Sequence, residues 1–438
     1  MLLRDRSRTS PLPPGPPLPV AVQTPLLWLA RQRFLPAMRR RYGDVFTLRI
    51  APTGTAVYLA DPLLVKQVFT GSTRVLHAGE GNAVLGSILG ERSVLLLDEE
   101  EHLAERKRML PAFHGERVAR TVELMAELTR AEVARWPRDE PFALHERMQA
   151  LTLDIIVRVV FGVTDAERAA PLAAALRDVV NIEVWHLPAF ISPAVARAAP
   201  WRVLRRRRAR ADRLIAEEVA RHVAEGGLEE RDDVLSMLLL ASDAGSGHVD
   251  AERTRDQLMT LLLAGHETTA SGLAWTFERL LRSPEALARV RAGLADERDP
   301  YRDAVVKESL RVRPVIHDVA RRLAEPLELG GWTLPAGTVV LPSIGLLHAD
   351  ERLHPDAAAF RPERWLADDA PGSAYAWIPF GGGTRRCLGA TFATTEMATV
   401  IRTVLQEVEL RAPDPRDEPQ EMAHITIVPS RGATVEVV

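Results

Sequence analysis

The longest helical pattern in this 438-residue chain runs from Glu252 to Arg282 without interruption. An α-helix of that length would be about 46 Å long, enough to cross a whole domain. The pattern stops at Ser283-Pro284, because proline cannot continue the preceding ladder of hydrogen bonds. Other long helical patterns dominate from about residue 100 to residue 313. The sequence therefore predicts one large, mainly α-helical domain.

Three shorter stretches have the alternation of strands and supply a small β region. Residues 44–61 predict two strands around a Pro-Thr-Gly turn, and residues 327–341 predict a second β piece. Residues 424–438 predict a terminal hairpin around Pro-Ser-Arg-Gly. Upstream, residues 26–43 read as one amphipathic helix. We expect residues 1–24 to be a proline-rich N-terminal strap and residues 25–438 to be the single domain.

Charge and cysteine content restrict the class of protein. The net charge of −3 gives no case for nucleic-acid binding. The single cysteine rules out intramolecular disulfides and any site that needs several thiolates, as expected for a reducing cytoplasm. No stretch of about 18 apolar residues is free of charge, so we expect a soluble, cytoplasmic protein without a transmembrane anchor. We expect a monomer.

The middle of the long helical pattern, "LLLAGHETTASG" (261–272), breaks local rules. A glycine inside a helix costs about 1 kcal/mol relative to alanine, and two threonines and Glu267 interrupt an apolar stripe. Such violations are typical of functional positions. A packing notch would explain the glycine but not Glu267. A zinc helix of the H-E-x-x-H type is excluded, because Ala270 stands where the second histidine belongs.

The only cysteine lies in "FGGGTRRCLG" (380–389). A lone cysteine is most often a small buried hydrophobe, but the context argues against that. Glycines at 381–383 and Gly389 let the backbone lie close to something flat. Arg385 and Arg386 favour a thiolate, and the helical pattern after Cys387 places the thiol near a helix N-terminus. One thiolate, a flat group and arginines for carboxylates are typical of haem iron with an axial cysteine.

This stretch fits F-x-x-G-x-R-x-C-x-G and resembles the haem-binding loop of the cytochrome P450 superfamily. The resemblance implies that Cys387 is the axial ligand of a haem b, and that Gly389 belongs to the cofactor-binding loop. It also implies that Phe380 packs near the ring and that Arg385 pairs with a haem propionate.

Two further motifs follow the order of the same family. "ESLR" (308–311) places Glu308 and Arg311 on one helix face, which alone would be an ordinary surface pair. "FRPERW" (360–365) resembles the segment that supplies the third member, Arg364. The resemblance implies a structural triad that holds the cysteine loop.

The resemblance also assigns roles to the remaining candidates. Ala264 and Gly265 would open a groove for dioxygen, and Glu267 with Thr268 would form the acid–alcohol pair that delivers protons. Thr268 can also donate a hydrogen bond back to the carbonyl of residue 264.

Three basic residues complete the expected cofactor contacts. His102 and Arg106 lie at i, i+4 and would be propionate partners, although their segment by itself reads as a solvated charged helix. Arg321, chosen over Arg322 by register, would meet the other propionate.

The resemblance implies a single-domain cytochrome P450 fold, mainly α with a small β region. The haem would lie buried between the long helix and the helix after the cysteine loop. The expected enzyme is a haem-thiolate monooxygenase that inserts one atom of dioxygen into a lipophilic small molecule such as a terpenoid, steroid, fatty acid or polyketide. No room is left for a flavin or nicotinamide domain, so a ferredoxin or flavodoxin with a reductase would supply electrons. A peroxide-using or non-oxygenase haem-thiolate enzyme, and a non-catalytic haem ligand-binding protein, are the alternatives.

The substrate pocket is expected to draw on four regions: residues 75–97, residues 160–200, Ile316 and the tip of the terminal hairpin. These are mostly apolar, with His317, Asp318 and His424 as the expected polar contacts.

Overall fold

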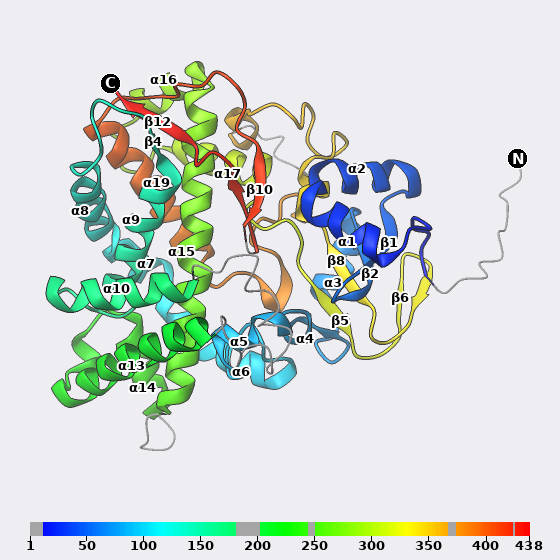
Figure 1. Cartoon of the computed structure of the whole chain (residues 1–438), viewed down its shortest axis with the longest axis horizontal. Helices are drawn as coiled ribbons and strands as arrows, with labels where there is room; N and C mark the ends of the chain where they lie inside the picture. The colour runs from blue at the N-terminus through cyan, green and yellow to red at the C-terminus, as the bar shows by residue number, and fades with distance from the viewer. Residues whose placement is uncertain (1–11, 181–201, 244–249, 367–373, 424) are drawn as a thin grey trace, which may run out of the picture. The chain divides into compact units, whose positions relative to one another are not determined.

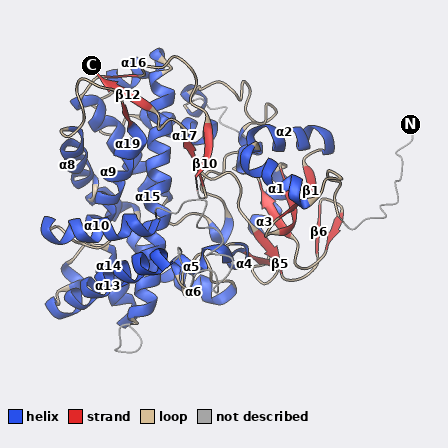
Figure 2. Cartoon of the chain, viewed as in Figure 1, coloured by secondary structure: helices blue, strands red, loops and turns tan. Residues whose placement is uncertain are grey.

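The computed structural model describes residues 12–180, 202–243, 250–366, 374–423 and 425–438, which pack as two compact units. The strand-rich unit comprises the described residues of 1–82, 317–357 and 371–386. The helical unit comprises those of 83–316, 358–370 and 387–438. Figure 2 shows that the second of these is mostly helix. The chain is thus mainly α with a small β region, as predicted.

A five-stranded sheet organises the strand-rich unit, in the order β1-β2-β8-β5-β3. Its β1–β2 antiparallel pair begins with Val45 opposite Leu59, which confirms the two strands predicted for residues 44–61. Strand β2 runs parallel to β8, and the remaining neighbours are antiparallel. The strands of this unit are β1 (Val45–Ile50), β2 (Gly54–Leu59), β3 (Leu76–His77), β5 (Arg321–Leu323), β8 (Val339–Pro342), and the separate pair β6 (Leu327–Leu329) and β7 (Trp332–Leu334).

The first helical pattern of the chain divides into two helices, where one had been expected. Ala30 leaves the helical conformation, with φ −138° and ψ 25°, and separates α1 from α2. Helix α1 begins at Val20 and so runs across residue 24. Leu27, Phe34 and Leu35 pack into one core with the apolar face of β1 and β2. The helices of this unit are α1 (Val20–Leu29), α2 (Arg31–Tyr42), α3 (Pro62–Thr70), α4 (Ala78–Gly81) and α18 (Ile344–His348), with a 3-10 turn η6 (Gly383–Arg385).

The long predicted helix is present as α15 (Ala251–Leu281) in the helical unit. Asp250 caps its first turn by accepting a hydrogen bond from the backbone N–H of Arg253, and Pro284 starts the next helix. Figure 1 shows α15 as the long green helix. The other helices here are α5 (Gly86–Leu89), α6 (Glu99–Met109), α7 (Gly115–Arg120), α8 (Val122–Val133), α9 (Leu144–Val159), α10 (Ala166–Val180), α13 (Arg202–Glu225), α14 (Val234–Asp243), α16 (Pro284–Ala292), α17 (Pro300–Val312) and α19 (Ala390–Glu407), with 3-10 turns η1 (Ala83–Leu85), η2 (Leu110–Phe113), η4 (Leu228–Glu230) and η5 (Pro362–Trp365).

Two glycines let neighbouring helices approach α15 closely. A Cβ on Gly265 would lie 3.1 Å from Ile156 of α9, and a Cβ on Gly272 would lie 3.3 Å from the sulfur of Met397 on α19. Both distances are tighter than ordinary van der Waals contact. Helices α9 and α19 therefore pack directly against the middle of α15.

The terminal hairpin expected at residues 424–438 is not formed. Strand β11 (Thr426–Pro429) pairs with β10 (Gln420–Ala423), whereas β12 (Thr434–Val437) lies between β4 (Phe142–Ala143) and β9 (Leu410–Arg411). Ile427 explains the difference, because its backbone is tied to Trp275 of α15 and to Val315. These contacts hold β11 apart from β12. Of the helices in the described ranges, none combines the length and apolar character that a membrane span needs.

Candidate active site

Cys387 lies between η6 and the first turn of α19, with its side chain exposed. Gly389 occupies the N-cap position of this 18-residue helix, and a Cβ there would meet no protein atom within 4 Å. The positive end of the helix stabilises negative charge, so the position favours a thiolate.

The glycines before Cys387 differ in what lies beside them. A Cβ on Gly382 would lie 2.3 Å from the ring of Phe69 in α3, and one on Gly383 would lie 1.8 Å from the Phe69 carbonyl oxygen. These two glycines therefore let α3 pack on the loop. Gly381, with φ +65°, has open space where a side chain would be.

Phe69 also contacts one of the predicted cofactor residues of the strand-rich unit, Arg321. The guanidinium of Arg321 lies 5.8 Å from the centre of the Phe69 ring, and Arg321 is buried on β5. Its neighbour Arg322 donates instead to the carbonyl of Gly337. Phe380 is half-buried and meets Trp377 edge to face, and Arg385 is half-buried at the end of η6.

The middle of α15 has one accessible stripe. Ala264 is exposed and Thr268 is half-buried one turn later, whereas Thr269 and Ala270 are buried. The Thr268 hydroxyl donates a hydrogen bond to the carbonyl oxygen of Ala264, as the sequence suggested. Gly265 faces Ile156 of α9, so this glycine also lets the two helices pack closely.

Glu267 points away from Thr268 and toward α9. The amide of Gln149 donates to its Oε2 at 2.7 Å, and the Nε2 atom of His145 lies 3.5 Å from its Oε1. Burial raises the pKa of Glu267, but contacts with His145 and Gln149 outweigh burial and hold the pKa below the usual 4.5. Glu267 is therefore an ionised, oriented carboxylate at neutral pH. Sequence reasoning missed His145 and Gln149.

The residue before Glu267 carries no charge at neutral pH. Burial lowers the pKa of His266 to about 4, and its Nδ1 atom lies 3.0 Å from the hydroxyl of Thr152 on α9. His266 is thus a neutral packing residue of the α9–α15 contact.

The predicted triad around Glu308 is confirmed. Arg311 donates to both carboxylate oxygens at 2.8 and 2.9 Å, and Arg364 donates to Oε1 at 3.1 Å. The indole of Trp365 and the backbone N–H of Arg361 add two donors that the sequence did not indicate. Burial raises the pKa of Glu308, but these donors lower it below its usual value.

His102 and Arg106 lie one turn apart on α6, His102 buried and Arg106 half-buried. The following turn, η2, carries Phe113, whose ring meets Phe392 of α19 edge to face at 6.4 Å. Because Phe392 follows Cys387 by five residues, the end of α6 lies beside the start of the cysteine helix.

Asp318 is not available to contact a substrate, which corrects the expectation for this residue. Its side chain is only 8% exposed and accepts from Arg31 and from the hydroxyl of Ser343. His317 lies 3.3 Å from the same carboxylate, so it too is engaged. His424 and residues 181–200 of the expected pocket lie outside the described residues.

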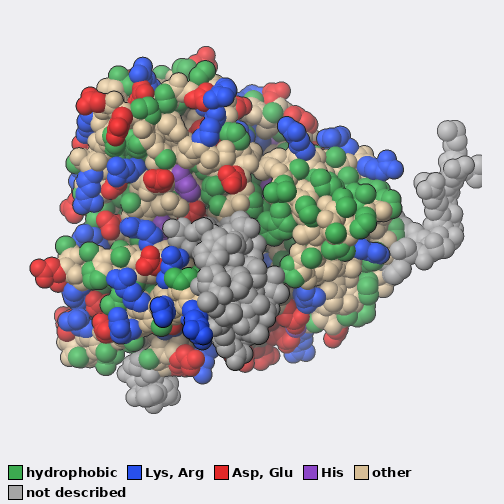
Figure 3. All heavy atoms as spheres, viewed as in Figure 1, with side chains coloured by type: hydrophobic (Ala, Val, Ile, Leu, Met, Phe, Trp, Pro, Cys, Tyr) green, Lys and Arg blue, Asp and Glu red, His purple; other side chains and the backbone are tan. Residues whose placement is uncertain are grey.

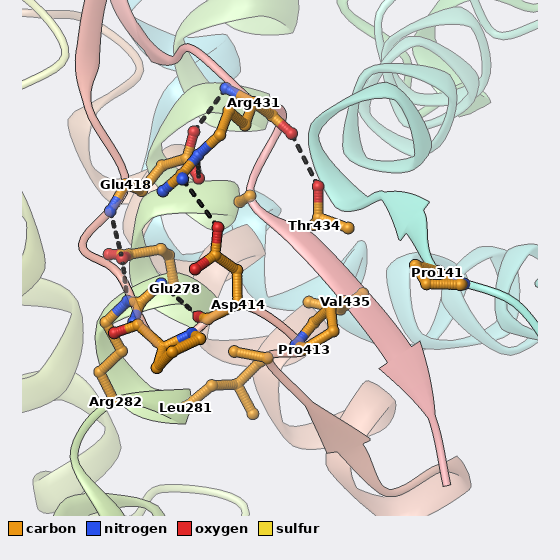
Figure 4. A pocket seen from close by; sticks show the side chains of 13 residues that line it. Pro141, Glu278, Leu281, Arg282, Pro413, Asp414, Glu418, Arg431, Thr434 and Val435 are labelled. Carbon is orange, nitrogen blue, oxygen red and sulfur yellow. Dashed lines mark hydrogen bonds and ion pairs between the residues drawn. The ribbon is translucent and has the colours of Figure 1, made fainter.

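A separate hollow at the C-terminal end of α15 has a volume of about 440 Å³ (Figure 4). Its charged groups are paired with one another: Glu278 with Arg282, and Arg431 with Glu418 and Asp414. Glu278 lies ten residues beyond Thr268, or about 15 Å along the helix. The hollow is therefore separate from the position of Thr268.

The donor set fits a haem. Within the described ranges no three His, Cys, Asp or Glu side chains gather to hold a metal ion. A single cysteine thiolate then holds a metal only if another group fills the remaining coordination positions, as the porphyrin nitrogens of haem do. The residues that would hold it are Cys387 on the iron and the arginine and histidine candidates on the propionates.

Comparison with known proteins agrees with this donor set. The family model described as cytochrome P450 matches residues 13–437. The chain is 44% identical to cytochrome P450 135B1 of Mycobacterium tuberculosis, covering 97% of this chain and 91% of that protein. It is 41% identical to cytochrome P450 135A1 of the same species, covering 98% and 96%.

Solved structures give the same fold. The retinoic acid-bound cyanobacterial CYP120A1 aligns with a TM-score of 0.85 at 22% identity, over 98% of this chain and 99% of that one. The haem domain of cytochrome P450DA aligns with a TM-score of 0.82 at 25% identity, over 98% of both chains. This chain belongs to the cytochrome P450 family and is a haem-thiolate monooxygenase.

Proposed function

We propose that this enzyme inserts one atom of dioxygen into a lipophilic small molecule of terpenoid, steroid, fatty-acid or polyketide type. The accessible stripe of α15 carries this proposal, since Leu261 and Ala264 precede Thr268 on it at helical spacing. Five partly accessible leucines pack against the hydrophobic core of the helical unit: Leu85, Leu95, Leu96, Leu261 and Leu263. An apolar lining of this kind favours an apolar substrate.

We assign the cofactor as haem b, with Cys387 as its axial ligand. When bound, the haem iron with its thiolate supplies the activation of dioxygen. Arg385, Arg321, His102 and Arg106 would hold the propionates, and Phe380 and Gly389 would lie against the ring. Residues 25–438 form the catalytic domain in this proposal, and the chain before residue 25 is attached to it through the bonds of Gln23 and Thr24 to the end of β1.

Glu267 and Thr268 deliver protons in this proposal. The Thr268 hydroxyl donates to the Ala264 carbonyl, so its oxygen keeps two lone pairs with which it can accept hydrogen bonds. Glu267 is ionised at neutral pH and therefore takes up a proton before it can pass one on. The carboxylate reaches His145 on α9, which makes α9 the expected side of proton entry.

We propose a ferredoxin or flavodoxin, with its reductase, as the electron donor. A cavity of about 730 Å³ is lined by Arg106, Lys107, Arg117 and Arg120, with Glu116 as its one acidic residue. The contact between Phe113 and Phe392 places this basic surface beside the cysteine helix. An acidic carrier would be steered to it by charge. We further propose that the enzyme works as a monomer in the cytoplasm, where a lone thiol stays reduced.

The first test is the carbon monoxide difference spectrum of the reduced protein. A strongly red-shifted Soret band that disappears in Cys387→Ser supports thiolate ligation. Thr268→Ala is then expected to consume electrons with at least about tenfold less product per electron. Thr276→Ala is the matched control, because Thr276 makes the same back-bond to the Gly272 carbonyl two turns further on.

Two outcomes contradict the proposal. Unchanged coupling in Thr268→Ala would remove the proton-delivery role. Full activity of that variant with hydrogen peroxide and no electron donor would favour a peroxide-using enzyme.

A further inference from the structure

Helix α1 turns its polar side chains inward. Its sequence, VAVQTPLLWL, contains two polar side chains, Gln23 and Thr24. Gln23 is buried, and its amide oxygen accepts from the backbone N–H of Arg49 on β1 at 2.9 Å. The Thr24 hydroxyl accepts from the backbone N–H of Ala51 at 3.0 Å. These two bonds to the end of β1 fix the rotation of the helix.

The outward face of α1 is consequently apolar. The exposed positions Ala21, Val22, Pro25, Trp28 and Leu29 follow the i, i+1, i+4, i+7, i+8 spacing of one helix face. Trp28 is 42% exposed and Leu29 is 86% exposed. A helix at a water-facing surface normally shows the reverse arrangement. We call these five residues the outer stripe; Figure 3 shows hydrophobic side chains gathered over the position of α1.

The stretch of sequence that contains the outer stripe and α2 is basic. Residues 19–43 contain five arginines and no Asp or Glu. Arg31 and Arg39 form ion pairs with Asp318 and Asp350, respectively. Figure 3 shows blue side chains over the position of α2.

The other three arginines of this stretch face solvent. Arg33, Arg40 and Arg41 are exposed, and no carboxylate of the described chain lies within ion-pair distance of them. The apolar face therefore has a positively charged border.

We propose that the outer stripe and these three arginines bind the surface of an anionic phospholipid bilayer. Tryptophan and aliphatic side chains are favoured at the boundary between headgroups and acyl chains, and arginines attract anionic headgroups. Helix α1 would lie in the plane of the interface, since ten residues span only about 15 Å. The stripe lies within the strand-rich unit, so the inference is independent of the proposed substrate and proton relay.

The test is co-sedimentation of the purified full-length protein with sucrose-loaded vesicles. Vesicles of phosphatidylcholine and phosphatidylglycerol at 7:3 are compared with pure phosphatidylcholine vesicles. The wild type is expected to bind the anionic vesicles and to lose this binding in 0.5 M salt. The variants W28S/L29S and R33Q/R40Q/R41Q are each expected to bind these vesicles at least about tenfold more weakly. V223S is the matched control, because Val223 on α13 is 47% exposed and lies outside the stripe.

A second measurement locates the contact. Brominated lipid is expected to quench wild-type tryptophan fluorescence more than that of W28F. Wild-type protein that stays in the supernatant, W28S/L29S that binds as well as wild type, or equal binding to neutral vesicles would each overturn the proposal. Stripe-dependent dimerisation in sedimentation velocity, without vesicle binding, would assign the stripe to a second copy of the chain instead.

Discussion

The Nε2 atom of His145 lies 3.5 Å from Oε1 of Glu267 and 3.2 Å from the hydroxyl of Ser271. Gln149, one turn further along α9, donates to the second carboxylate oxygen. Helix α9 therefore holds the carboxylate that precedes Thr268. The residues that set the ionisation of Glu267 belong to a helix that carries no recognised motif.

Replacing His145 is expected to raise the pKa of Glu267. In His145→Phe the carboxylate loses one contact that lowers its pKa, while burial and Gln149 stay. A hydrogen bond to a charged group contributes about 1.5 kcal/mol, which corresponds to about one pKa unit. The measurement is an infrared titration of the carboxyl C=O stretch, with Glu267→Gln subtracted.

Ser271→Ala is the control for this titration, because it removes a neighbour of the same histidine nitrogen and leaves Glu267 untouched. We expect the pKa of Glu267 to be unchanged in the control. In His145→Phe, the pH at which the product formed per electron declines should be higher than in the wild type. A titration in His145→Phe that coincides with the wild type would show that His145 does not act on Glu267.

Loss of the Glu308 charge is expected to destabilise the fold strongly. In Glu308→Gln, the guanidinium groups of Arg311 and Arg364 face an amide in a buried site, and breaking a buried pair of this kind costs about 3–5 kcal/mol. Glu363→Gln is the control, because Glu363 is half-exposed and such pairs contribute about 1 kcal/mol or less. Urea unfolding followed by circular dichroism gives both values. Equal midpoints for the two variants would contradict the structural role of the triad.

Sequence information was sufficient where the determining interactions are local. The periodicity of residues 252–282 predicts α15 to within one residue at each end, and the Thr268 back-bond joins residues four apart. The triad around Glu308 could be predicted for another reason: the order of its motifs resembles that of a known family.

Contacts between distant segments were not predictable. Arg31 is 287 residues from Asp318 in sequence, and nothing near Asp318 indicates that its charge is used internally. His145 and Glu267 are likewise brought together only by the packing of α9 on α15. The prediction of a terminal hairpin was wrong for the same reason, because Trp275 and Val315 bind the backbone of β11.

The buried pair of Arg31 and Asp318 is expected to give an acid-dependent stability difference. Burial raises the pKa of Asp318, but Arg31, His317 and Ser343 lower it to about 2. A lowered folded-state pKa contributes stability above the usual value of 3.8, and this contribution disappears as the pH falls toward 2. Asp318→Asn is expected to cost about 3 kcal/mol at pH 7, and the difference from wild type should shrink by about 2 kcal/mol at pH 2.

Thermal unfolding from pH 7 to pH 2 checks this window. The exposed Asp139 provides the control substitution, Asp139→Asn, for which we expect no pH-dependent difference. A pH-independent gap between Asp318→Asn and wild type would show that the carboxylate charge is not what Arg31 requires.

Glu396 on α19 is expected to make the enzyme less stable as the pH rises. Its side chain is buried, its Oε1 atom has no hydrogen-bond partner in the described chain, and burial raises its pKa well above 4.5. The folded state therefore holds a proton that the unfolded state releases. Stability should fall by about 1.4 kcal/mol per pH unit above the usual pKa, until the folded-state carboxyl ionises.

Glu396→Met removes the carboxyl and is expected to raise the free energy of unfolding by about 1–3 kcal/mol at neutral pH. Glu396→Gln keeps a buried polar group but cannot titrate, so it should lose the pH slope with a smaller gain. The exposed Glu407 on the same helix serves as the control, since Glu407→Gln should change neither quantity. Urea midpoints between pH 5 and pH 8 measure both effects. A slope that persists in Glu396→Met would place the titrating group elsewhere in the protein.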